Sequence, residues 1–150
     1  MKKTLWLLVC CLVTQLASAQ TPKWAEKARS AVFSIVTYDK DNKIKGTGNG
    51  FYIDVQGTAL SDYTLFEGAE RAIIINTNGK QMEVSHILGA NSMYDIVKFR
   101  TPMDKKQVTL TLATQPAEVD EIVDLLPYST QKAATVQTGR ITAVDSIGNN

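Results

Sequence analysis

The chain contains one histidine, His86, and that imidazole is the natural starting point for any chemistry it performs. Nucleophilic catalysis by serine needs an imidazole to take the proton and a carboxylate to orient that imidazole. Asp95 follows His86 by nine residues. A zinc site built on a single histidine would have to rely on carboxylates, and no acidic cluster of that kind occurs in the sequence. We therefore predict no metal and no cofactor, and we interpret His86 as a structural side chain.

The beginning of the chain has the three parts of a secretory signal peptide. Lys2 and Lys3 precede an apolar run over 5–13, and Ala17-Ser18-Ala19 supplies the small residues that a signal peptidase reads. We expect residues 1–19 to be removed, leaving Gln20 first, in a protein that is periplasmic or secreted. An uncleaved membrane anchor is the alternative, but the apolar run is too short to span a bilayer.

Removal of this segment changes the remaining chemistry. Both cysteines, Cys10 and Cys11, lie inside it, so the mature chain would have neither a disulfide nor a thiol nucleophile. Lipidation of Cys10 is disfavoured because Val9 stands where a small residue is required. Sixteen basic side chains oppose fifteen acidic ones, and losing Lys2 and Lys3 leaves fourteen. This balance predicts no binding of nucleic acid and no stable membrane insertion after cleavage.

The rest of the chain alternates short β-type segments with turn residues, after one short helix. Thr21-Pro22 is typical of a helix start, with Pro22 at the first helical position, and the helix should end near Ser30. Gly46 to Gly50 is interpreted as a glycine-dense connection, and Gln56-Gly57 and Asn78-Gly79 as hairpin turns. Strands are expected over 31–38, 51–54, 58–61, 72–76, 81–88, 94–100, 108–112, 121–126 and 136–144. This spacing predicts an all-β barrel or sandwich.

Four segments, in order over residues 31–147, resemble the trypsin-like serine proteases of the bacterial Deg/Htr branch. Residues 48–54 (GNGFYID) are similar to that family's G-S-G-F-I-I-D strand, and 57–69 to its G-x-I-L-T-N-x-H-V-V-x-G-A segment. The third segment runs from residues 78–80 (NGK), which resemble the family's D-G-x stretch, to residues 94–99 (YDIVKF), which resemble its T-D-L-A-L-L-K motif. Residues 138–144 resemble the T-x-G-I-V-S strand. The resemblance implies a chymotrypsin-like fold, with a first barrel over 31–100 and a connector and partial second barrel over 101–150.

The same resemblance places the candidate site residues and shows where they depart from the family. Thr64 stands at the position of the catalytic histidine, and Asp95 at that of the acid. A threonine hydroxyl is not basic enough to accept a proton near neutral pH, so Asp95 would be vestigial or simply a turn former. The family's G-N-S-G-G segment does not occur in the 150 residues. Gly46, Gly48 and Gly50 are not a phosphate loop, because a strand and not a helix follows them.

Three functional hypotheses remain. The first is an exported, catalytically inactive trypsin-like domain, a pseudoprotease, that binds a peptide or an envelope protein as a scaffold module. The second is an active serine endopeptidase whose remaining catalytic groups lie beyond residue 150, and the third is an unrelated β-barrel binding module. Residues 20–30 would form the short N-terminal helix in each case. The half-finished second barrel leads us to expect that the 150 residues are a fragment or a truncated product.

The mass of the native mature protein tests these expectations about the two ends. A mass matching Gln20–Asn150 would support both signal cleavage and a chain that stops within the second barrel. A mass that includes residues 1–19 would contradict the predicted cleavage. A substantially larger mass would instead identify the chain as a fragment, and the residues after Asn150 would then distinguish the first two hypotheses.

Overall fold

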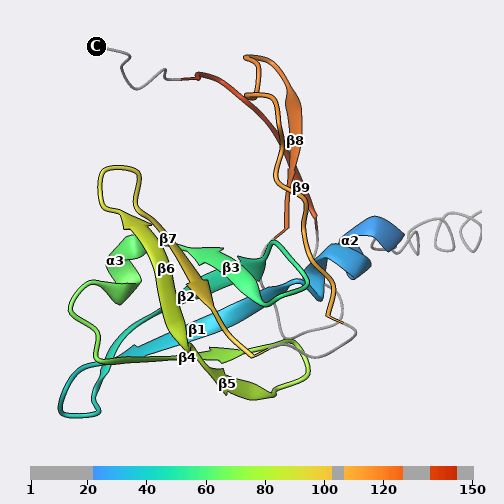
Figure 1. The fold of residues 1–150 in the computed structure, drawn as a ribbon. Coiled ribbons are helices and arrows are strands. Elements are labelled where there is room, and N and C mark those ends of the chain that lie inside the picture. Colours follow the sequence, from blue (N-terminus) through green and yellow to red (C-terminus); the bar gives the residue numbers. More distant parts are fainter. Residues whose placement is uncertain (1–21, 103–106, 127–135, 145–150) are drawn as a thin grey trace, which may run out of the picture.

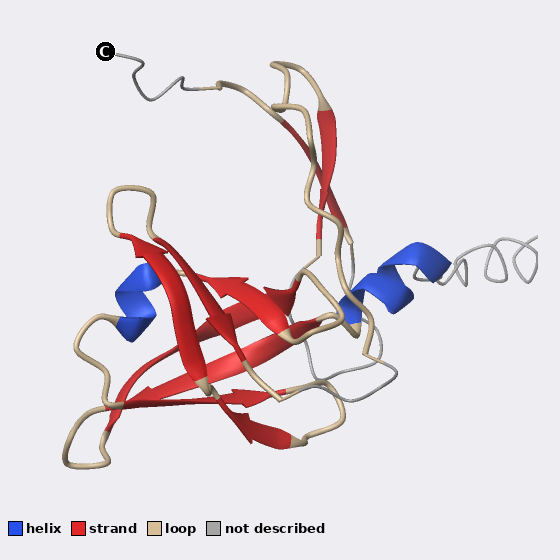
Figure 2. Cartoon of the chain, in the orientation of Figure 1, coloured by secondary structure: helices blue, strands red, loops and turns tan. Residues whose placement is uncertain are grey.

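The computed structural model describes residues 22–102, 107–126 and 136–144, which are dominated by β-strands (Figures 1 and 2). Seven strands form one curled antiparallel sheet in the order β5-β4-β1-β2-β3-β7-β6, and β8 pairs with β9 separately. The elements, in chain order, are α2 (Lys23–Arg29), β1 (Val32–Tyr38), β2 (Ile44–Tyr52), β3 (Thr58–Ser61), α3 (Tyr63–Phe66), β4 (Arg71–Ile75), β5 (Gln81–Glu83), β6 (His86–Asn91), β7 (Ile96–Arg100), β8 (Ile122–Leu125) and β9 (Gln137–Arg140). The predicted all-β, chymotrypsin-like first barrel is confirmed in its architecture.

The interior of the sheet is filled by alternate residues of the strands. Along β1 every second side chain is buried, including Phe33 and Ile35, because successive residues of a strand point to opposite faces. The Phe33 ring lies 4.8 Å from that of Tyr52 and 6.2 Å from that of Phe99, measured between centroids. These rings come from β1, β2 and β7, so one aromatic cluster ties together strands from both halves of the sheet.

A two-residue corner joins the two ends of the sheet. The Val84 N–H donates to the Ala72 carbonyl on β4 at 3.0 Å, whereas the Ser85 N–H donates to the Arg100 carbonyl on β7 at 2.9 Å. The chain therefore changes partners between β5 and β6. The sequence predicted one strand over 81–88, and this expectation is wrong because the corner divides it into two.

The hairpin turns follow their sequence signals. The Asp54 carboxylate accepts the N–H groups of Gln56 (2.8 Å) and Thr58 (3.0 Å), while Gly57 takes a φ of 84° that other residues rarely adopt. Gly79 has a φ of 82° in the turn between β4 and β5. Both predicted hairpins, β2–β3 and β4–β5, are confirmed.

Residues 46–50 are not the connection that the glycine content indicated. They form the middle of β2, paired throughout with β1. A Cβ on Gly48 would collide with the Leu65 side chain of α3, and a Cβ on Gly50 would lie 2.7 Å from the Phe33 ring and 2.8 Å from the Leu60 carbonyl oxygen. These two glycines are required by close packing within a strand and not by a turn.

Three other boundaries differ from the sequence prediction. Pro22 is the N-cap and not the first helical residue, because its φ and ψ of −56° and 141° are non-helical while its carbonyl accepts the first helical N–H groups. Thr21 lies outside the described residues. Residues 108–112 form no strand, although the Leu110 N–H donates to the Tyr52 carbonyl at 2.8 Å. Tyr94 and Asp95 belong to the turn before β7, which begins at Ile96.

The last two strands form a separate ribbon that extends away from the barrel (Figure 1). Ile122 and Leu125 on β8 are exposed, as is every residue of β9. The predicted strand over 121–126 is confirmed, while β9 is shorter than the predicted 136–144. In the described part of the chain, neither helix has the length and apolar character needed to cross a bilayer.

The packing around Gly50 yields a stability prediction. Gly50→Ala should lower the free energy of unfolding by about 2 kcal/mol, because the added methyl group meets a buried ring and a fixed carbonyl. Gly89→Ala is the matched control, since Gly89 is also in a strand but has no atom within 4 Å of the added Cβ. The free energy of unfolding of Gly89→Ala should differ from that of the unmodified chain by no more than about 1 kcal/mol. Urea unfolding measures both, and equal effects would contradict the proposed packing.

Candidate functional site

Helix α3 positions Thr64 at one end of the barrel. The helix follows β3 directly, with Asp62 as its N-cap, and it packs on β2 through Leu65 against Gly48. At its other end, the Phe66 ring lies 5.1 Å from that of Phe99. These two contacts hold a helix that is only four residues long, while Thr64 itself stays exposed.

Asp95 lies in the turn between β6 and β7 and is joined to α3 by three hydrogen bonds. Its carboxylate oxygen Oδ1 accepts the Thr64 N–H at 2.7 Å and the Thr64 hydroxyl at 2.8 Å. Its carbonyl accepts the Tyr63 N–H at 3.1 Å. Asp95 adopts a φ of 50°, which is unusual for a residue other than glycine. The structure thus brings together the two predicted site residues from positions 31 apart in the sequence.

These hydrogen bonds determine the ionisation of Asp95. The Thr64 amide contributes most to lowering the pKa of this carboxyl below its ordinary value of 3.8, and the Thr64 hydroxyl adds to it. Desolvation opposes the shift but does not cancel it. The carboxylate therefore remains an ionised acceptor, and the Thr64 hydroxyl is already engaged as its donor. The pair can fix α3 to the turn, but neither group can take up a proton at neutral pH.

His86 does not join this pair. It is the first residue of β6, exposed and in register with Arg100, whereas Asp95 lies beyond the opposite end of the same strand. The length of β6 separates them by roughly 16 Å along the strand direction. A direct His86–Asp95 interaction is excluded in this arrangement. Among the described residues, no group of three or more His, Cys, Asp or Glu side chains could hold a metal ion.

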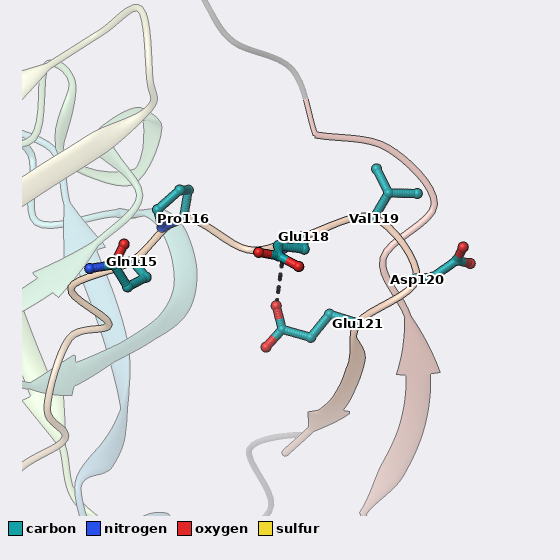
Figure 3. Close-up of a pocket in the computed structure, with 6 residues that line it drawn as sticks. All are labelled: Gln115, Pro116, Glu118, Val119, Asp120 and Glu121. Carbon is teal, nitrogen blue, oxygen red and sulfur yellow. Dashed lines mark hydrogen bonds between the residues drawn. The ribbon is translucent and has the colours of Figure 1, made fainter.

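One cavity lies away from Thr64 and Asp95, in the bend that leads into β8 (Figure 3). It has a volume of about 520 Å³ and is lined by Gln115, Pro116 and residues 118–121. The Glu118 N–H donates to the Glu121 carboxylate at 3.1 Å, and Asp120 lies 3.6 Å from Arg140. Every lining residue is exposed, so this is the open inner side of a loop and offers no enclosed site.

A smaller cleft was not predicted from the sequence. It has a volume of about 190 Å³ and lies where residues 66–72 meet residues 83–87. The barrel corner at Val84 and Ser85 brings these segments together. Residues 66–69 end the family-like stretch over 57–69, whereas no motif marks residues 83–87. Only the sheet topology creates this cleft, so no sequence signal could have identified it.

Of three comparisons with known proteins, the one with solved structures supports the architecture described above. No protein-family model matches the chain. The chain is 28% identical over 97 residues to a 17.4 kDa class III heat shock protein from Arabidopsis thaliana, which covers 58% of the chain and 63% of that protein. Among solved structures, an HtrA-type protease (AlgW, a variant with tripeptide) is similar with a TM-score of 0.63 and 18% identity.

The structural likeness covers 84% of this chain and 41% of the protease chain. The chain thus spans less than two thirds of the length of each of these two proteins. At this level of identity the likeness to the protease shows the fold alone, which is trypsin-like. It agrees with the fold that the sequence motifs implied.

The Thr64–Asp95 contact predicts a measurable pKa change. Thr64→Val removes the hydroxyl donor but keeps the amide, so the pKa of Asp95 should rise part of the way towards 3.8. Carboxyl chemical shifts followed by NMR between about pH 2 and 6 measure it. Thr47→Val, an exposed strand position away from Asp95, is the control. An unchanged Asp95 titration in Thr64→Val would contradict the contact.

The lowered pKa of Asp95 also determines whether the fold gains or loses stability at acid pH. Because folding lowers the pKa of Asp95, its contribution to stability is present above the unfolded value of about 3.8 and is lost as pH falls through the folded value. The pKa of Asp54 is also lowered, chiefly by the Thr58 hydroxyl. Asp54 therefore also contributes stability that is lost as the pH falls. Urea midpoints should therefore decrease as the pH falls below about 4, and less steeply in Thr64→Val.

Proposed function

We propose that this protein is a catalytically inactive trypsin-like domain that acts as an exported binding or scaffold module. One observation carries the proposal: the hydroxyl of Thr64, at the position where the family has its base, donates a hydrogen bond to Asp95. The trypsin-like fold supports the comparison of positions. In that comparison the acid is present, but the group it would orient is replaced by one that cannot carry protons.

The chemistry of the site argues against family-type hydrolysis. A general base must have a pKa near the working pH and must lie within reach of the nucleophile's proton. Thr64 does not meet the first requirement, and His86 lies at the far end of β6 from Asp95. Loss of the base from a triad typically removes nearly all of its catalytic power. Asp95 then serves to hold α3 in place through its hydrogen bonds.

The partner we propose is a peptide or another envelope protein. Strand addition at a free edge of the sheet is the binding mode that suits a barrel of this kind. The nearly balanced charge argues against nucleic acid as the partner. The lysines and apolar run at the start of the chain support export to the periplasm or beyond, although residues 1–19 lie outside the described residues.

The active serine endopeptidase remains the second candidate. It is favoured by the ionised Asp95 carboxylate next to α3, where an acid would be needed. Its nucleophile would have to come from sequence beyond residue 150, and its base from a group other than Thr64. The third hypothesis, an unrelated barrel, is disfavoured, because the fold is trypsin-like and the residues at the family's base and acid positions, Thr64 and Asp95, are in contact.

Hydrolysis assays test the proposal directly. The full chain should show no turnover of fluorescently labelled casein above that of buffer, and Thr64→His should also show none, because the 150 residues do not include the family's G-N-S-G-G segment that carries the nucleophile. Binding of the same labelled casein, followed by fluorescence anisotropy, should be equal for both proteins, since Thr64 is not expected to contact the partner.

A contaminating protease is the main source of error in such an assay. Asp95→Asn, purified in the same way, provides the control, because the endopeptidase hypothesis depends on the Asp95 carboxylate. Turnover by the unmodified chain that disappears in Asp95→Asn would overturn the inactive assignment and favour the endopeptidase. Turnover that persists equally in all three proteins would identify the contaminant, and the assay would then be repeated on material from which it has been removed.

A further inference from the structure

The cleft beside the barrel corner has an apolar floor that continues the core. It is lined in part by Phe66, Ala72, Val84 and Ile87, and the Phe66 ring packs on the buried Phe99 ring. Its volume of about 190 Å³ is below the roughly 300–1,000 Å³ of typical small-molecule pockets. A cleft of this size and lining suits one long side chain.

The cleft is lined by two acidic side chains, Glu70 and Glu83, and by the cation Arg71, with the His86 imidazole at the same cleft. Both glutamates are exposed, and neither forms an ion pair with any residue that the structure describes. Arg71 is engaged with other residues: its guanidinium lies 4.2 Å from the Tyr38 ring centroid and donates to Asn42 at 3.3 Å. Two carboxylates above an apolar floor favour a side chain with an aliphatic stem and a positive end.

The strand next to the cleft has a free edge. Within the described ranges β6 is paired with β7 only, and all six of its residues are exposed (Figure 1). Residues 87–94 carry no charged side chain that would discourage pairing. Gly89 has open space where a Cβ would be, which leaves room for another backbone to approach. A register shift near Leu88 marks the point where this edge meets the cleft.

We propose that the edge of β6 and the adjoining cleft bind an extended peptide segment, with a lysine or arginine side chain of that segment in the cleft. The peptide backbone pairs with β6, the aliphatic stem lies on Phe66 and Val84, and the charged end reaches Glu70 and Glu83. This inference rests on the proposed binding function and names its site and the chemistry of its partner. Main-chain pairing supplies affinity in this mode, and the cleft supplies specificity.

A panel of short peptides tests the proposal on the full chain. The probe is a fluorescein-labelled, end-blocked heptapeptide, Thr-Val-Ser-Lys-Ser-Val-Thr, and matched peptides carry arginine, norleucine or glutamate at the centre. Lysine and arginine peptides should bind about tenfold more tightly than the norleucine peptide, as expected for two partly exposed ion pairs. The glutamate peptide should bind most weakly. The advantage should shrink at about 0.5 M salt.

Two kinds of variant separate the cleft from the edge. Glu70→Gln combined with Glu83→Gln should remove the preference for lysine and leave affinity for the norleucine peptide unchanged. Glu67→Gln, at an exposed glutamate that does not line the cleft, should keep the preference. Gly89→Pro should weaken all four peptides, because proline cannot donate a backbone hydrogen bond and distorts the strand with which the peptide pairs. N-methylation of alternate peptide amides tests the same pairing without changing the protein.

The outcomes distinguish a failure of the proposed docking site from a failure of the proposed function. An unchanged preference for lysine in the double glutamine variant would overturn the cleft assignment. No saturable binding of any peptide up to about 1 mM would overturn the docking proposal as a whole. Neither result bears on catalytic inactivity, which the casein assay decides. Chromatography of the recovered peptides adds a separate check, because cleavage would contradict the inactive function while leaving the docking site in place.

Discussion

The change of hydrogen-bond partner between Val84 and Ser85 is the constraint on which the rest of the structure depends. One chain segment pairs with β4 before the corner and with β7 after it, and this joins the two ends of a seven-stranded sheet. Phe33 and Phe99 can then share one core although they lie on strands far apart in the sequence. The same divergence leaves β6 with a partner on one side only and opens the cleft beside it. The closure of the barrel and the candidate docking site therefore have one cause.

Much of the fold could be predicted from the sequence because its signals are local. The Asn78-Gly79 turn, the alternating strand over 32–38 and the helix over 23–29 each depend on residues within a few positions of one another. The glycines at 48 and 50 were misinterpreted for the opposite reason. Their role is set by Leu65 and Phe33, which lie elsewhere in the chain, and glycine content alone cannot distinguish a close approach from a turn.

The candidate site likewise has residues that could be predicted from the sequence and residues that could not. The resemblance to a family supplied Thr64 and Asp95, because an ordered set of motifs carries positions across even where a residue has changed. It could not supply the cleft, because Glu70, Glu83 and Val84 lie outside the matching segments and meet Phe66 only through the sheet topology. It also could not show that Thr64 contacts Asp95 through both its amide and its hydroxyl, since that depends on the unusual φ of Asp95 in the turn before β7.

The two candidate sites are linked through α3. At one end of this short helix, Thr64 and Tyr63 are bound to Asp95, and at the other end Phe66 forms part of the cleft. A four-residue helix has little stability of its own, so its position must come from these flanking contacts. The Thr64 side chain satisfies the Asp95 carboxylate over a short reach. Under the proposed function, a residue at the family's acid position stabilises the helix that positions one wall of the proposed docking cleft, so an inactive site and an intact fold are compatible.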